Sequence, residues 1–181
     1  NGSNPATVEL GNAYSDAGAT AFDEFHGNTS VSSSGNVDTS TVGSYTISYT
    51  ATDLDGNTAT ASRTVNVVDT TNPVVTVTGD NPATVELGGT YTDAGATATD
   101  LSGTVEVVTS GTVDTDTVGE YTLTYTSTDA SENAGTATRT VNVTDTVKPV
   151  FTSSSTFVVD ENVTTIGTVN AAVDAAPYDM T

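Results

Sequence analysis

The sequence contains no cysteine and no tryptophan, and it has only one histidine and one methionine among 181 residues. Without cysteine, disulfide bonds cannot stabilise a small secreted fold, and zinc loses its usual thiolate ligands. The chain has no Gly-x-Ser-x-Gly motif and no second histidine, so no machinery for nucleophilic catalysis is visible. Carboxylate pairs arise by chance in such an acidic chain and do not by themselves indicate glycoside hydrolysis. We therefore predict a protein that is not an enzyme and has no catalytic residues.

Positive charge is equally scarce, because Arg63, Arg139 and Lys148 face 23 acidic residues and the net charge is −20. Such a charge excludes nucleic acid and anionic membrane surfaces as partners. Apolar runs extend over only a few residues, so direct membrane insertion is not expected. The acidity is compatible with solubility in salt water, with binding of divalent cations, or with both. In a cysteine-free extracellular domain a bound metal is a common substitute for disulfides.

What the chain does contain is an internal repeat. The segment Asn4–Gly11 returns unchanged as Asn81–Gly88, at an offset of 77 residues. Further on, the segment Arg63–Val67 returns as Arg139–Val143, at an offset of 76. We call residues related by these offsets twins. Repetition at this period indicates an array of whole domains, and such arrays provide length or valency more often than chemistry.

Alternating side chains predict that each repeat is built from strands. Tyr45, Ile47 and Tyr49 share one face of a strand whose other face carries hydroxyl groups. In the following run, alternation predicts that Ala59, Ala61, Val65 and Val67 face inward. A period of two with one apolar face is typical of antiparallel strands that cover a core. Threonine and valine are the commonest residues and favour extended structure. Strands every ten residues or so, without helical periodicity, predict an all-β Greek-key sandwich.

Specific motifs then identify a family resemblance. They are the Val-Glu-Leu-Gly opening, the segment Tyr91–Ala96, the Gly119-Glu120-Tyr121 sequence before the long strand, and the linker Asp69–Pro73. On these motifs residues 4–146 resemble tandem bacterial immunoglobulin-like repeats of large surface adhesins. The resemblance implies immunoglobulin-like sandwiches and an extracellular, cell-surface location. The Gly-x-Tyr spacing further suggests a tyrosine corner.

The domain boundaries follow from the repeat. We predict a first repeat at 1–70, whose first strand is missing, a second repeat at 71–146, and a partial third segment at 147–181. In the third segment, Phe157–Asn162 and Ile166–Val169 resemble the start of a cadherin-like repeat. Such repeats place an acidic residue near this point to bind calcium.

Calcium is the expected cofactor, and the loop Asp53-Leu54-Asp55-Gly56-Asn57 has the alternating oxygen ligands and turn glycine of a calcium loop. It lacks the bidentate glutamate of an EF-hand, and an ordinary turn would have the same composition. The twin of this loop in the second repeat is Asp129–Asn133. In an immunoglobulin-like sandwich, this loop lies at the end where the chain enters. Several acidic residues should therefore converge on the linker, where they would repel one another without a cation. The predicted ligands of this junction are Asp38, Asp69, Asn72, Asp100, Asp129 and Glu132. A second junction would use Asp145 with Asp160 or Glu161.

The remaining polar and aromatic residues have structural interpretations. Arg63 and Arg139 lie in register with inward residues, so we predict ion pairs with the duplicated Asp16 and Asp93. His26 is the single histidine, has no twin and follows two phenylalanines in the segment 22–27. Phe22, Phe25 and His26 could form a contact patch or fill a loop core.

These observations together predict a non-enzymatic extender or stalk segment of a repeat adhesin or surface fibre, stiffened by calcium at its junctions. Its partners would be neighbouring repeats of the same chain or identical subunits. One alternative is a self-assembling filament subunit, in which the C-terminal segment donates a strand to the next copy. The other is a carbohydrate- or protein-binding accessory module, although the scarcity of aromatics argues against sugar stacking.

Overall fold

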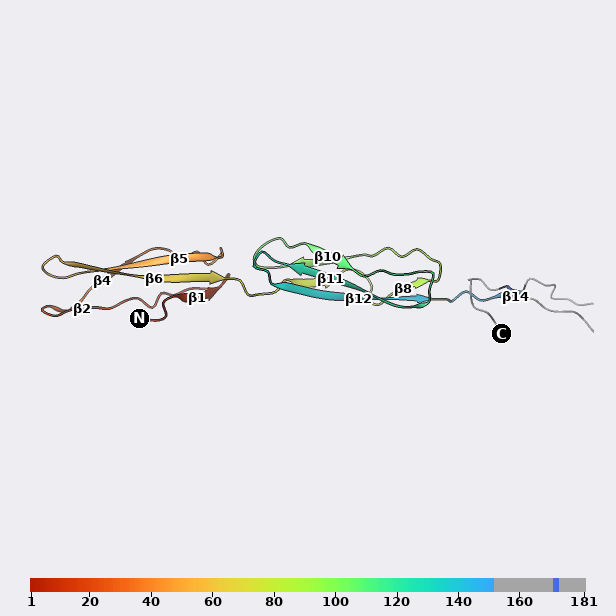
Figure 1. Cartoon of the computed structure of the whole chain (residues 1–181), viewed down its shortest axis with the longest axis horizontal. Coiled ribbons are helices and arrows are strands. Elements are labelled where there is room, and N and C mark those ends of the chain that lie inside the picture. Colours follow the sequence, from red (N-terminus) through yellow and green to blue (C-terminus); the bar gives the residue numbers. More distant parts are fainter. Residues whose placement is uncertain (152–170, 173–181) are drawn as a thin grey trace, which may run out of the picture. The chain divides into compact units, whose positions relative to one another are not determined.

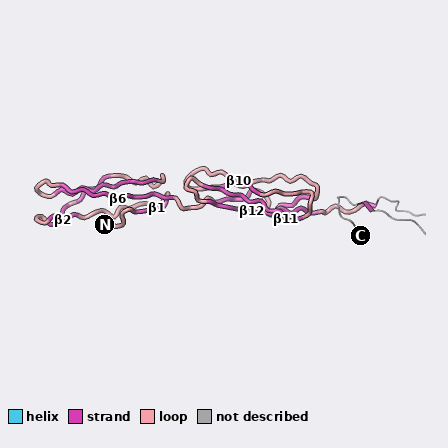
Figure 2. The backbone as a smooth tube through the Cα atoms, viewed as in Figure 1, coloured by secondary structure: helices cyan, strands magenta, loops and turns pink. Residues whose placement is uncertain are grey.

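The computed structural model describes residues 1–151 and 171–172, and all of its regular elements are strands (Figure 1). No helix that is long and apolar enough to cross a membrane occurs in this part of the chain, where Figure 2 shows only strands and loops. The chain divides into two compact units, and the first unit includes segments of the second repeat. The sheets are described below repeat by repeat. The first consists of Asn1–Thr76, Thr97–Val108 and Thr126–Thr136, and the second of Val77–Ala96, Thr109–Tyr125 and the described residues from Ala137 onward.

The first repeat is built on a four-stranded sheet. Its strands in chain order are β1 (Ala6–Glu9), β4 (Val31–Ser34), β5 (Gly43–Thr52) and β6 (Thr58–Val68). They lie side by side in the order β1-β6-β5-β4. β5 pairs antiparallel with β6 along its whole length, whereas β1 pairs parallel with the second half of β6. Long β-branched and Tyr-rich strands of this kind suit a pleated surface that is buried on one side.

The core of the first repeat follows the predicted alternation. Ile47 and Tyr49 of β5 and Val65 of β6 form its buried centre. Partly buried side chains from β1, β4 and the loops, among them Val8 and Val31, pack against this centre. The sheet thus buries one face, as the period of two predicts.

The second repeat has the same sheet with its own strands. These are β8 (Ala83–Glu86), β10 (Val107–Ser110), β11 (Gly119–Thr128) and β12 (Ala134–Thr144), in the order β10-β11-β12-β8. β8 pairs parallel with β12, as β1 does with β6. The buried centre is made by Leu123, Tyr125, Val141 and Val143.

Each repeat has a tyrosine corner at the start of its long antiparallel strand. The Tyr45 hydroxyl donates a hydrogen bond to the Thr41 carbonyl at 2.8 Å. The Tyr121 hydroxyl donates to the Thr117 carbonyl at 2.9 Å. Both phenols reach back four residues and fix the loop before the strand, the arrangement that the Gly-x-Tyr spacing predicts.

The repeats differ in their remaining short strands. The second repeat has β7 (Val74–Val77), which pairs with β9 (Ala96–Thr99). The first repeat instead has a hairpin of β2 (Ala21–Asp23) and β3 (Gly27–Thr29). Within the described chain, β2 pairs with β3 alone.

The alanines at the start of β6 are less buried than the valines on the same face of the strand. Ala59 and Ala61 were expected to face inward with Val65 and Val67, yet only the two valines are buried and both alanines are exposed. In the second repeat the twin of Ala59 is Gly135, which is buried beneath Pro73. The alanines lie on the inward face but have no strand above them, because no described segment of the first repeat takes the place of β7.

Beyond the second repeat, β13 (Val150–Phe151) pairs antiparallel with β14 (Ala171–Ala172). The proposed ligands Asp160 and Glu161, and most of the cadherin-like segment, lie outside the described residues. The predicted domain boundaries and the cadherin-like interpretation therefore stay predictions.

Candidate functional site

The most elaborate polar structure of the chain surrounds the linker that follows β6. Glu9, the last residue of β1, holds the beginning of this linker. Its carboxylate accepts hydrogen bonds from the Thr70 amide at 2.7 Å, the Thr70 hydroxyl at 2.9 Å and the Thr71 hydroxyl at 3.1 Å. The Thr70 amide bond is the main reason why the pKa of Glu9 lies below its ordinary value. The linker is thus tied back to the first repeat by a carboxylate about sixty residues away in sequence.

The same device recurs after the second repeat. The Glu86 carboxylate accepts hydrogen bonds from the Thr146 hydroxyl at 2.7 Å and from the Thr146 amide at 2.8 Å. These bonds, the hydroxyl first, hold the pKa of Glu86 below its ordinary value. Glu9 and Glu86 are twins, so this anchoring is a property of the repeat.

Asp69 stands at the start of the linker and is only 7% exposed. Its Oδ1 accepts a hydrogen bond from the Thr71 amide at 3.1 Å, which shapes a local turn. Its backbone carbonyl accepts a hydrogen bond from the Asn133 side chain at 3.1 Å. Its Oδ2 is buried without a hydrogen-bond partner. A buried carboxylate oxygen with no partner is costly, since it has lost water and gained nothing in exchange.

Two further carboxylates lie close to that of Asp69. Asp69, Asp100 and Asp129 each place a carboxylate oxygen within 4.8 Å of the other two, and all three belong to the first compact unit. Asp129 is as buried as Asp69, at 7% exposed, and Asp100 is half-buried. We call this group the linker corner.

Local hydrogen bonds fix the two loop carboxylates. Asp129 accepts hydrogen bonds from the Ser131 amide and from the amide and side chain of Asn133, at 2.8 to 2.9 Å. Burial alone would raise the pKa of Asp129, but these bonds outweigh burial and the pKa lies below its ordinary value. Asp100 Oδ1 accepts from the Ser102 amide at 2.7 Å, whereas its Oδ2 is buried and has no partner.

The chemistry of the linker corner is that of a hard-cation site. Three carboxylates lie close together, and two of them, those of Asp69 and Asp100, have a buried oxygen with free lone pairs. Both arginines of the chain are paired elsewhere, with Asp16 and Asp93. Oxygen ligands in flexible numbers suit Ca²⁺, which takes six to eight of them, and leave nothing for a metal that prefers nitrogen or sulfur.

The structure places the other predicted junction ligands outside this group. Asp38 is exposed and closes its own turn by accepting hydrogen bonds from Ser40 and Thr41. Glu132 is exposed and adopts a positive φ of 69° in the turn that Asp129 begins. Asn72 is an exposed residue of the linker. Asp145 is exposed, and its Oδ1 accepts from the Val147 amide at 3.2 Å, as its twin Asp69 does with Thr71.

The first repeat has a related corner. Asp23 and Asp53 are the twins of Asp100 and Asp129, and here the third group is His26. The His26 Nδ1 lies 3.0 Å from Asp23, and its Nε2 lies 3.7 Å from Asp55. Asp53 accepts hydrogen bonds from the amide and side chain of Asn57, both at 2.8 Å. Sequence reasoning missed Asp23, although its offset of 77 from Asp100 marks it as a twin.

A buried polar cluster lies in the interior of each repeat. Arg63 contacts Asp16, and Arg139 lies 2.5 Å from Asp93. Each guanidinium also stacks over a core tyrosine, at 5.6 Å for Tyr49 and 5.8 Å for Tyr125. The arginines are buried on the inward face of β6 and β12 and their aspartate partners are half-buried, so the pairs stabilise the fold.

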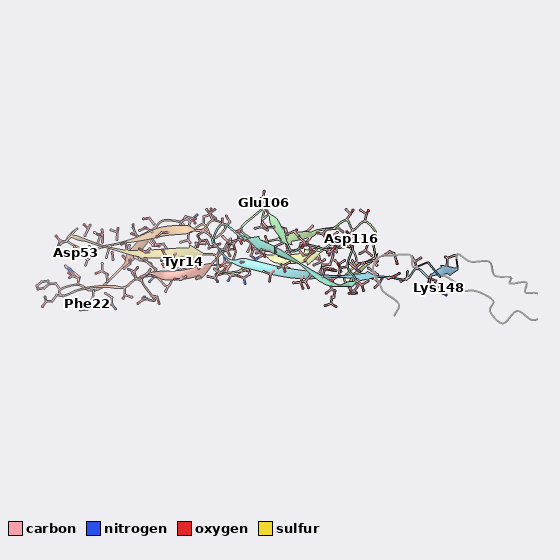
Figure 3. All side chains as sticks on the ribbon, turned by 45° about the vertical axis from the view of Figure 1, so that its right-hand side comes forward. Tyr14, Phe22, Asp53, Glu106, Asp116 and Lys148 are labelled. Carbon is pink, nitrogen blue, oxygen red and sulfur yellow. The ribbon has the colours of Figure 1, made fainter. Side chains whose placement is uncertain are left out.

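The predicted contact patch lies on the β2–β3 hairpin. Phe22 is 75% exposed and Phe25 is 89% exposed, so neither fills a loop core. Figure 3 shows Phe22 and Asp53 at the same end of the first repeat, where they line one hollow. His26 is held by Asp23 beside them.

Fold and sites define a class: tandem immunoglobulin-like modules whose polar features lie at linkers and loops. Two copies of one family model, described as "Bacterial surface protein, Ig-like domain", match residues 1–67 and 75–143. The chain belongs to this family and is a tandem module of a bacterial cell-surface protein. The family indicates a structural role without catalysis.

Solved structures similar to the chain include a bacterial lipoprotein. A crystal structure of a lipoprotein from Bacteroides thetaiotaomicron is 27% identical to the chain over 44% of its length, with a TM-score of 0.38. The match covers 43% of that lipoprotein. No curated protein matches the chain.

Proposed function

We propose that the chain is an extender segment of a large bacterial surface adhesin or fibre, and that calcium bound at the linker corner stiffens it. The observation that carries this proposal is the buried carboxylate of Asp69, whose Oδ2 has no hydrogen-bond partner, in a group where two more carboxylates each place an oxygen within 4.8 Å. A cation would supply the missing partner and neutralise the repulsion among the three charges.

The source of each ligand gives the ion a mechanical role. Asp69 belongs to the linker, whereas Asp100 and Asp129 belong to loops of the second repeat. An ion that binds all three would hold the linker against those loops. It would add to the bond between Asn133 and the Asp69 carbonyl, and Glu9 already anchors the next two linker residues. A linker fixed in this way loses the freedom that short flexible connections otherwise keep.

Calcium is the ion of choice for two reasons. Surface proteins meet calcium outside the cell at concentrations that suit sites with dissociation constants of about 0.1 to 1 mM. Magnesium requires near-octahedral geometry and gives up water reluctantly, so a corner of three carboxylates favours the larger ion.

The experiment is a calcium titration of the purified chain by isothermal calorimetry, with the variants Asp69→Asn and Asp100→Asn. Each substitution keeps the size of the side chain and the oxygen that closes its local turn, but removes one charge. Both should weaken calcium binding at least tenfold. The control is Asp114→Asn, which alters an exposed carboxylate outside the linker corner and should leave the affinity of this site unchanged.

Stiffening is measured separately, by small-angle X-ray scattering with calcium and with chelator. We expect a narrower distribution of particle dimensions with calcium in the wild type and no such change in Asp69→Asn. Equal calcium affinity in wild type and Asp69→Asn would remove the ion from the linker corner. Scattering that is indifferent to chelator would keep the extender but remove calcium from its mechanism.

The other predictions for function and cofactor remain proposals of lower rank. A second calcium junction from Asp145 with Asp160 or Glu161 involves residues outside the described chain. Binding of a sugar or protein partner would use the exposed patch of Phe22 and Phe25. Filament assembly by strand donation would use the C-terminal segment, most of which lies outside the described residues.

A further inference from the structure

A hollow of about 550 Å³ lies in the second repeat, wholly within the second compact unit. Residues of the segment 89–93, which follows β8, line it together with Thr109 of β10, residues of the loop 111–115 and Leu123 of β11. We call it the threonine hollow, because four of its lining residues are threonines, namely Thr90, Thr109, Thr112 and Thr115.

Local contacts hold the lining segments of this hollow in place. The Gly88 amide donates a hydrogen bond to the Thr115 carbonyl at 2.7 Å and so ties the segment 89–93 to the loop 111–115. The Tyr91 hydroxyl donates to Asp93 at 3.3 Å and accepts from Arg139 at 3.3 Å, which fixes the phenol. A site that is held in shape before a ligand arrives loses less conformational entropy on binding.

The lining combines hydroxyl groups with apolar surface. Thr90, Thr109 and Thr112 are exposed, and a threonine hydroxyl can both donate and accept a hydrogen bond. The ring of Tyr91 and the side chain of Val113 are half-buried and add apolar surface. Small-molecule sites of about 300 to 1,000 Å³ typically have this mixture of apolar surface and a few polar groups. It suits a ligand whose ring carbons are apolar and whose rim carries hydroxyl groups.

Charge in the hollow favours a neutral ligand. Burial alone would raise the pKa of Asp93, but hydrogen bonds from Tyr125 and the Gly95 amide and the charge of Arg139 outweigh burial, so the pKa lies below its ordinary value. This carboxylate and the net charge of −20 repel an anionic ligand, and none of the lining residues is basic. Arg139 lies 2.5 Å from Asp93 and compensates its charge, so a cationic ligand gains little there.

We propose that the threonine hollow binds a neutral sugar unit of an oligosaccharide. The sugar hydroxyls exchange hydrogen bonds with Thr109 and Thr112, and the ring carbons lie against Tyr91. Recognition depends on hydroxyl groups and one tyrosine, so it does not need the stacked aromatics that this chain lacks. The inference is independent of calcium and of the extender role, and its site belongs to the second repeat, whereas the Phe22 and Phe25 patch belongs to the first.

The first repeat provides an internal comparison, because it differs at the residues that carry the proposal. The twins of Thr90, Thr109 and Thr112 are Ala13, Ser33 and Asn36, and the twin of Gly89 is Asn12. Two of the three exposed threonines thus have no hydroxyl counterpart there. Binding should therefore be confined to the second repeat.

The probes are three neutral trisaccharides, maltotriose, cellotriose and mannotriose, each titrated into the isotopically labelled chain and followed by NMR. We expect at least one of them to shift the amides of 89–93 and 111–115 and to leave the twin amides of 12–16 and 35–39 in place. Trigalacturonic acid, which is acidic, should shift neither set. Thr109→Val and Thr112→Val keep the side-chain shape but remove a hydroxyl, and each should weaken binding about fivefold. The control is Thr84→Val, which alters an exposed threonine of β8 that does not line the hollow and should leave the affinity unchanged.

The amide spectra of the variants also report whether each one is folded, so a loss of binding can be assigned to the missing hydroxyl. Absence of shifts with all three neutral trisaccharides would overturn the proposal. Equal affinity in Thr109→Val, Thr112→Val and Thr84→Val would show that the threonine hydroxyls do not hold the ligand. Shifts of equal size in both repeats, or equal binding of trigalacturonic acid, would mean that the contact is not specific to the hollow and would also overturn the proposal.

Discussion

At the scale of single residues, both repeats bury a charged cluster instead of a purely apolar centre. Arg139 is 1% exposed and stands between the Asp93 carboxylate and the ring of Tyr125. The Tyr125 hydroxyl donates a hydrogen bond of 2.6 Å to the same carboxylate. Removing one member of such a cluster leaves the others buried and unpaired, which costs more than the cluster contributes.

Tyr125 provides the first test. Burial, followed by the hydrogen bond to Asp93, raises the pKa of Tyr125 to about 12. Because the folded pKa exceeds the ordinary value of 10, the resulting stability is complete below pH 10 and is lost as pH rises through 12. Absorbance at 295 nm should show a late ionisation phase in the wild type, and Tyr125→Phe should remove one tyrosine from it.

Two carboxylate substitutions test whether the late phase belongs to Tyr125. Asp93→Asn removes the charge that Tyr125 faces, so the late phase should move toward pH 10. Asp114→Asn alters a carboxylate of the same repeat that accepts hydrogen bonds from its own turn, and it should leave the phase in place. A late phase that survives Tyr125→Phe at full amplitude would contradict the assignment.

The sequence predicted the charged pairs and the position of the linker carboxylates. Duplication placed Arg63 with Asp16 and Arg139 with Asp93, because twin charges on an inward strand face need twin partners. Topology similarly placed Asp69, Asp100 and Asp129 near one another. The orphan Oδ2 atoms of Asp69 and Asp100 could not be foreseen, since they depend on side-chain rotamers and on which oxygen closes the local turn.

At the scale of elements, carboxylate hydrogen bonds hold the residues that follow the last strand of each repeat. Glu9 and Glu86 each end a strand that pairs parallel with the last strand of its repeat, and each then holds the residues that follow that last strand. In each parallel pair, the C-terminal ends of the two strands lie side by side. The Glu carboxylate at the end of the first strand is therefore next to the linker residues that follow the last strand.

The Glu9 contact is testable by amide exchange. Glu9→Ala removes the acceptor of the Thr70 amide, so hydrogen exchange at Thr70 should accelerate at least tenfold. The Thr146 amide, which Glu86 holds in the same way, should exchange as before and serves as the internal control. Unchanged exchange at Thr70, as measured by NMR, would mean that the carboxylate does not hold the linker.

The same contact has a defined pH dependence. The pKa of Glu9 is lowered from its ordinary 4.5, so its stabilising contribution is present above pH 4.5 and is lost as pH falls through the folded value. Protection of the Thr70 and Thr146 amides should therefore decrease together in acid. In Glu9→Ala, only Thr146 should retain this acid dependence.

Element prediction from sequence succeeded where both partners of a pattern lie in one segment. The alternation of Ile47 and Tyr49 predicted β5 and its buried face. Alternation also placed Ala59 and Ala61 on the inward face, but it could not predict that they stay exposed, because burial depends on whether another strand covers that face. The Glu9 contact was missed for a similar reason, since about sixty residues separate the carboxylate from the amide that it binds.

At the scale of the whole molecule, the dominant feature is a net charge of −20 that three basic residues do not offset. Like charges on a folded chain repel one another and destabilise the compact state, and mobile ions screen this repulsion over about 10 Å at 0.1 M salt. A polyanionic module therefore gains stability from any salt. Calcium at a defined site must be distinguished from calcium as one more screening ion.

Thermal unfolding of the wild type and Asp69→Asn separates the two contributions. Sodium chloride should raise the unfolding temperature of both proteins by similar amounts, because one charge in twenty changes the overall repulsion little. Calcium at about 1 mM adds little ionic strength, so it should raise the unfolding temperature of the wild type and much less that of Asp69→Asn. Asp114→Asn carries the same net charge as Asp69→Asn and should respond as the wild type does. If all three proteins respond to calcium equally, its effect is general screening, and the rigidity of the linker depends on Glu9 and Asn133 alone.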